Sequence, residues 1–92
     1  MDKIILSRSI KIGDSETTEI EIDFSKITGN DLVRAEAEAR AKGDTSPSMF
    51  LSMKYQLMLA AKIIGVKYEE LLDLPAEDCK KVIAPVALFL LG

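Results

Sequence analysis

Histidine is absent from this 92-residue sequence, and cysteine occurs once, as Cys79. The lack of histidine removes the commonest general base, the Ser–His and Cys–His nucleophile pairs and most zinc sites. A single cysteine cannot form an intramolecular disulfide. Cys79 occupies an apolar helical position with no candidate base beside it, so we interpret it as buried and inert. The sequence therefore predicts a non-catalytic protein with no cofactor and no metal site.

Aromatic residues and long apolar runs are also scarce. The chain has three Phe, two Tyr and no Trp, so aliphatic residues and four Met must fill its core. The longest apolar run, residues 86–91, is far shorter than the roughly 20 residues that span a bilayer. No basic and apolar leader opens the chain. We therefore expect a soluble, cytoplasmic protein that does not enter a membrane.

The charge pattern argues against nucleic-acid binding. The formal net charge is −3, and Lys80-Lys81 is the only adjacent basic pair, whereas nucleic-acid affinity depends on clustered Lys and Arg. The acidic residues of the 69–78 segment lack the loop pattern of a calcium hand. We interpret them as solvated helix surface that complements helix dipoles. They are Glu69, Glu70, Asp73, Glu77 and Asp78.

Residues 1–25 have the alternating pattern of a β-hairpin. Apolar side chains alternate with polar ones on both sides of Gly13 and Asp14, which have turn chemistry. A lone hairpin is marginal in water, so helices must cover its apolar side. In the second strand we expect Thr18, Ile20, Ile22 and Phe24 to face the core, and Glu19, Glu21 and Asp23 to face solvent.

Residues 28–92 have helical patterns. Thr28 and Asp31 predict a capping box for a helix that ends at Gly43. A second, central helix is expected from Ser46-Pro47 to Ile64. A short helical turn over residues 66–72 precedes a last helix that starts after Pro75, and Pro85 should kink or break that helix. The sequence thus predicts one α+β domain of 92 residues, with an N-terminal hairpin packed on three to four helices.

The central helix and the C-terminal run are more apolar than a thin domain easily buries. Both segments pack against each other and the hairpin in the simpler interpretation. In the alternative, part of this surface forms a groove for a partner helix. The candidate partner-binding residues are Met49, Phe50, Met53, Leu57, Met58, Val86, Phe89 and Leu90.

The order of several short motifs resembles a known family. Lys3-Ile-Ile-Leu-Ser-Arg-Ser-Ile-Lys-Ile-Gly13 opens the chain, and Ile22-Asp-Phe24 ends the second strand. Ile27-Thr-Gly-Asn-Asp-Leu32 enters the first helix, Ala61-Lys-Ile-Ile-Gly-Val66 leads to Leu71-Leu-Asp-Leu-Pro75 with Asp78, and Ala87-Leu-Phe-Leu90 lies near the end. This arrangement resembles the small tail assembly chaperones of tailed bacteriophages and prophages, in the branch that begins with a hairpin.

The resemblance implies a role during virion assembly in the host cytoplasm. Such proteins bind the long, apolar, helical tape measure protein, keep it soluble and help tail tube subunits assemble around it. The tape measure protein is therefore the expected partner, with the tail tube protein as a second one, and a homo-oligomer stays open. Two alternatives remain from the sequence: a structural tail or head-completion component, and a small non-catalytic regulator.

Overall fold

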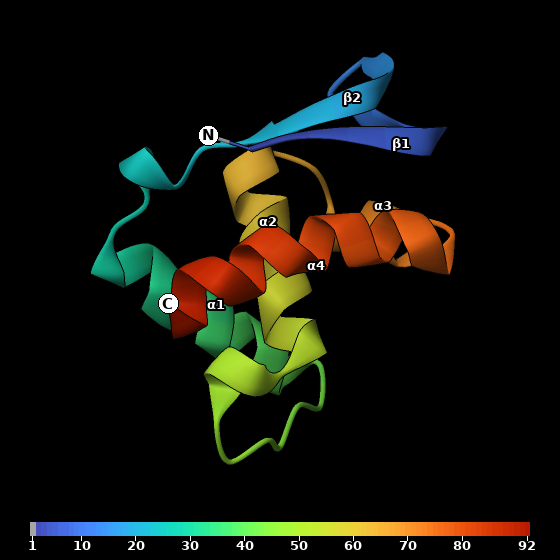
Figure 1. The fold of residues 1–92 in the computed structure, drawn as a ribbon. Coiled ribbons are helices and arrows are strands. Elements are labelled where there is room, and N and C mark those ends of the chain that lie inside the picture. Colours follow the sequence, from blue (N-terminus) through green and yellow to red (C-terminus); the bar gives the residue numbers. More distant parts are fainter. Residues whose placement is uncertain (1) are drawn as a thin grey trace.

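The computed structural model describes residues 2–92 and confirms the predicted α+β class, with a hairpin followed by four α-helices (Figure 1). Strands β1 (Asp2–Ile12) and β2 (Ser15–Ile22) pair antiparallel, with Ile12 opposite Ser15. Gly13 has a φ of 62° at the first position of the turn between them. Glycine adopts this backbone without steric cost, which is why it suits a tight hairpin turn.

The pairing of the two strands is irregular in the middle of β1. The register shifts between Ile5 and Ile10. Within this irregular stretch, the backbone N–H of Ser7 donates to the carboxylate of Asp78, which lies near the start of the last helix. The middle of β1 is therefore bonded to a helix at the point where its regular pairing with β2 is interrupted.

The register shift decides which side chains of β2 face the helices. Ile20 and Ile22 are buried, as the alternation predicts. Thr18 is exposed, so its predicted core position is wrong. The cause is the shift, because it places Thr17 opposite Ile10 and so changes the inward-facing residue at this point.

The hairpin also ends earlier than predicted. Phe24 leaves the strand and begins the 3₁₀ turn η1 (Phe24–Lys26). Asp23 starts this turn, since its carboxylate accepts the backbone N–H of Ser25 at 3.0 Å and the Ser25 hydroxyl at 2.7 Å. Phe24 still packs against the core, but from the turn rather than from the sheet.

Helix α1 (Gly29–Ala41) has the predicted start and cap, and it ends two residues before the predicted stop at Gly43. The Thr28 hydroxyl accepts the backbone N–H of Asp31, and the Asp31 carboxylate accepts the backbone N–H of Thr28. Ala35 and Ala39 are fully buried, on the side of α1 that packs on α2. Small side chains at these positions let the two helices approach closely.

The predicted start of the central helix at Ser46-Pro47 is wrong. The 3₁₀ turn η2 (Met49–Leu51) comes first, and helix α2 (Met53–Ile64) begins after Ser52. The Ser52 hydroxyl accepts the backbone N–H of Tyr55 at 3.2 Å and donates to the buried carboxylate of Asp44. Asp44 also accepts the backbone N–H of Ser46 at 2.9 Å, which holds Ser46 in the loop rather than in a helix.

Helix α2 is the centre of the fold. Every residue from Tyr55 to Ala61 is buried, because α2 contacts α1, α3, α4 and β2 on different sides. The helix ends at Gly65, as predicted, where a φ of 85° permits the left-handed cap. The buried apolar side chains of the hairpin and the helices form one cluster around it.

Two helices complete the chain. The short helix α3 (Tyr68–Leu72) is followed by α4 (Ala76–Leu91), which crosses α2 and packs on β1 (Figure 1). The sequence predicted either a kink or a break of this helix at Pro85. The predicted break is wrong, because α4 continues through Pro85. Val82 and Val86 are both fully buried on either side of Pro85, and their packing offsets the lost backbone hydrogen bond.

Candidate functional site

An apolar groove of about 750 Å³ opens between β1, η1 and the C-terminal half of α4. Its size falls within the roughly 300–1,000 Å³ range of binding pockets. Its lining residues come from both ends of the chain: Lys3, Ile4, Ile5, Phe24, Lys81, Ala84, Pro85, Leu88 and Phe89.

An aromatic pair closes one part of the groove. The rings of Phe24 and Phe89 stack with centroids 4.4 Å apart and planes 10° from parallel. The Asp23 cap turns the chain out of β2, which brings Phe24 to α4 rather than leaving it in line with the strand. The contact therefore joins η1 to the C-terminal half of α4 and fixes that wall of the groove.

Two lysines supply the charged groups among the described lining residues. Lys3 lies 2.8 Å from Glu19 across the hairpin, and the hydrogen bond with that carboxylate raises the pKa of Lys3. The ammonium group of Lys81 donates to the backbone carbonyl of Ile5 at 3.1 Å and lies 3.8 Å from Asp78. Both ammonium groups are thus held near the groove while their side chains stay more than half exposed.

The predicted partner-binding residues divide into buried and accessible ones. Four belong to the buried core, namely Met49, Leu57, Met58 and Val86. Phe50, Met53 and Phe89 are exposed, and Leu90 is half-buried. Of the eight residues, only Phe89 lines the groove. The structure therefore narrows the accessible part of the predicted surface to four side chains in two places.

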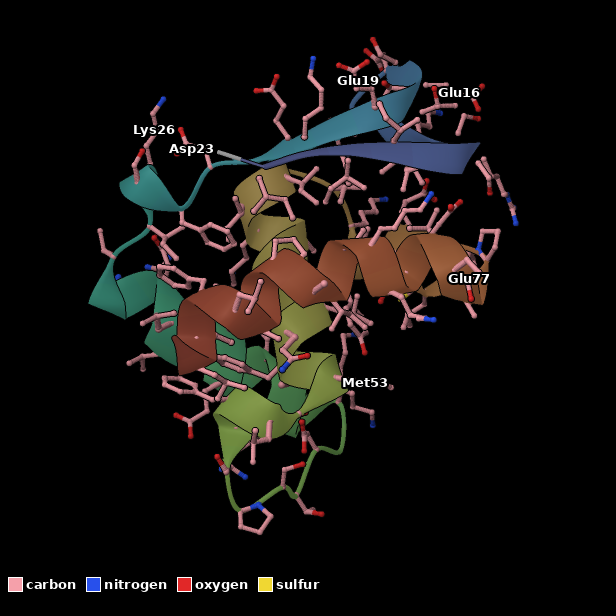
Figure 2. The ribbon with its side chains drawn as sticks, in the orientation of Figure 1. Glu16, Glu19, Asp23, Lys26, Met53 and Glu77 are labelled. Atoms are coloured by element: carbon pink, nitrogen blue, oxygen red, sulfur yellow. The ribbon has the colours of Figure 1, made fainter. Side chains whose placement is uncertain are left out.

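The second place is the start of α2. Phe50 and Leu51 of η2 are exposed next to Met53 at the beginning of the helix. Figure 2 shows Met53 far from the hairpin, whose Glu16 and Glu19 lie on the side facing away from the helices. None of these residues lines the groove, so the exposed residues around Met53 form a separate surface.

Most residues of the groove could not be predicted from single segments of the sequence. Ile5 and Leu88 are large apolar side chains on positions that face away from the core, and both are exposed. An apolar residue on the polar side of a strand or helix can indicate a binding surface, and this feature of the sequence could have identified both residues. The sequence could not predict that Lys3 and Lys81 lie on one surface, because only the packing of β1 against α4 brings them together.

The acidic residues of the 69–78 segment serve separate contacts rather than one site. Glu69 pairs with Lys42 at 3.2 Å. Glu70 accepts the backbone N–H of Lys11 at 3.1 Å, and Asp78 accepts that of Ser7. Within residues 2–92, no three His, Cys, Asp or Glu side chains lie close enough together to hold a metal ion.

Cys79 lies half-buried in α4, where burial raises the pKa of its thiol. A raised pKa keeps the sulfur protonated near neutral pH and lowers its nucleophilicity. The side chain is thus only half-buried rather than buried as predicted, although it packs against the core as a small apolar residue does.

No helix in the described part of the chain is long and apolar enough to cross a membrane. A family model described as "Phage tail assembly chaperone proteins, E, or 41 or 14" matches residues 3–91. Neither a curated protein nor a solved structure matches the chain.

Proposed function

Because this chain belongs to the phage tail assembly chaperone family, we propose that it binds the tape measure protein of its phage and keeps that protein soluble. It then aids assembly of the tail tube, whose subunit is a second proposed partner. Binding and assembly take place in the host cytoplasm before the tail is complete, and neither involves a catalytic step. Membership of the family is the observation that carries the proposal.

The surface of the molecule supports this function. A chaperone for an apolar helical client needs an accessible apolar surface on an otherwise charged body. The groove supplies such a surface, and the exposed side of the hairpin carries Glu16, Glu19 and Glu21. The negative net charge of −3 favours solubility of the complex while the client is bound.

Co-expression tests the proposal. The tape measure protein is produced with this chain, and separately with an unrelated small acidic protein as the control. We expect a soluble complex that copurifies only with this chain. If the tape measure protein stays insoluble although the chain is folded, the proposal is wrong, and detection of the chain in purified virions would instead indicate a structural tail component.

A further inference from the structure

We propose that the groove between β1, η1 and α4 binds an amphipathic helix of the client, and that carboxylates flanking the apolar stripe of this helix pair with Lys3 and Lys81. This inference rests on the proposed chaperone function and adds the binding site and the chemistry of the bound segment. The exposure, the charge and the backbone bonding of the groove support it.

The apolar side chains of the groove are accessible in the isolated chain. Leu88 is 75% exposed, Ile5 is 55% exposed and Phe89 is 42% exposed. These residues lie on two elements that face each other across the groove. A partner that covers these side chains is bound more tightly, because each Å² of apolar area removed from water stabilises the complex by roughly 25 cal/mol.

The positive charges of the groove favour a partner with acidic side chains. Among the described lining residues the charged ones are Lys3 and Lys81, although the chain as a whole is acidic. Each ammonium group has three N–H donors, and the structure assigns one donor contact of Lys3 to Glu19 and one of Lys81 to Ile5. Lys81 also lies 3.8 Å from the Asp78 carboxylate. Each ammonium group nevertheless keeps N–H donors for carboxylates of a partner, whereas the groove lining offers no carboxylate to a basic helix.

The backbone bonding of the hairpin favours a helix over an added strand. Strand addition requires free main-chain groups at a sheet edge. Along β1, side chains from α3 and α4 already bond the carbonyl of Ile5 and the N–H groups of Ser7 and Lys11. On β2, the Thr17 hydroxyl bonds both the N–H and the carbonyl of Glu19. A helix instead presents side chains to the groove and leaves these bonds intact.

The test uses fluorescent peptides of about 20 residues that tile the tape measure protein. We expect binding by peptides that form helices with acidic residues beside an apolar stripe, and weaker binding after their Asp and Glu are changed to Asn and Gln. Leu88→Ser should weaken binding of these peptides by about tenfold or more. The matched control Leu72→Ser removes another exposed leucine, which lies in α3 outside the groove, and should leave the affinity unchanged.

The lysines are tested by the salt dependence of affinity. In the double variant Lys3→Gln/Lys81→Gln, affinity at low salt should fall by about two- to fivefold for each lost pair, and added salt should weaken binding less than in the wild type. Lys54→Gln/Lys80→Gln changes the net charge equally but leaves the groove intact, and it should keep the wild-type salt response. Melting temperatures of all variants show whether each one is folded.

The outcomes separate this proposal from the proposed function. If the folded groove variants still bind the peptides and full-length tape measure protein as the wild type does, the groove proposal is wrong and the chaperone function stands. If the wild type binds neither, both fail. A second copy of this chain is the other possible occupant of the groove, and analytical ultracentrifugation tests for it. If the wild type is a dimer and Leu88→Ser is a monomer, the groove binds a second copy and the proposal is wrong.

Discussion

The Asp78 carboxylate fixes the middle of β1 through Ser7. Its two oxygens each lie 3.0 Å from the Ser7 backbone nitrogen, and the Ser7 hydroxyl donates to Oδ2 at 2.8 Å. Asp78 is 1% exposed and lies in the first turn of α4, where the helix dipole favours a negative charge. The contact joins residues 71 positions apart and holds β1 beside the helix that forms the opposite wall of the groove.

Loss of this carboxylate should destabilise the protein. Asp78→Asn removes the charge and leaves an amide that cannot accept the Ser7 N–H and hydroxyl as the two oxygens do. We expect the melting temperature near neutral pH to fall by several degrees. Glu77→Gln, a change at the exposed residue that precedes Asp78, should leave the melting temperature nearly unchanged. Equal melting temperatures for the wild type and Asp78→Asn would contradict the anchoring role.

The same contact predicts a pH dependence. Hydrogen bonds from the Ser7 backbone and hydroxyl lower the pKa of Asp78 below 3.8, although burial opposes the shift. A lowered folded-state pKa gives a stabilisation that is present above the unfolded value and is lost as the pH falls through the folded one. The melting temperature of Asp78→Asn should therefore fall less than that of the wild type between pH 5 and pH 2.

Asp44 predicts a second acid-sensitive contact, at the start of α2. Hydrogen bonds from Ser46 and Ser52 lower the pKa of Asp44 to about 2. The stabilisation is thus present above about pH 4 and is lost as the pH falls toward 2. Asp44→Asn and Ser52→Ala should each lower the melting temperature near neutral pH, since both release the α2 cap. Asp14→Asn, in the exposed hairpin turn, serves as the control.

The contact between α1 and α2 should not tolerate larger side chains. Ala39 is fully buried where α1 packs on α2, so Ala39→Leu should lower the free energy of unfolding by roughly 1–3 kcal/mol. Ala37→Leu makes the same change on an exposed position of the same helix and should stay within about 0.5 kcal/mol of the wild type. Urea denaturation followed by circular dichroism measures both. Equal losses in the two variants would indicate a propensity effect instead of packing.

Two methionines of α2 should behave differently although five positions separate them in one helix. Met58 is 3% exposed and Met53 is 65% exposed. Met58→Ala should cost roughly 2–5 kcal/mol of unfolding free energy, whereas Met53→Ala should cost about 0.5 kcal/mol or less. Denaturant titration of both variants checks this difference. If Met53→Ala weakens binding of the tape measure protein without lowering stability, the exposed residues around Met53 form part of the client surface.

The sequence alone determined the local features of this protein. Alternation of apolar residues and a Gly-Asp turn define the hairpin, and the Thr28–Asp31 capping box and Gly65 fix helix ends. Each depends on residues within a few positions, so short-range rules apply. The motif order was also sufficient to indicate the chaperone family.

Only the tertiary structure decided the features that join distant segments. The bond between Ser7 and Asp78 bridges the irregular register of β1, and the Asp44–Ser52 contact moves the start of α2 beyond Ser46. Burial of Met58 and exposure of Met53 depend on which neighbouring helices cover each side of α2. The groove arises where β1 meets α4, because packing brings Lys3 and Lys81 to one surface, and no periodicity within either segment encodes that meeting.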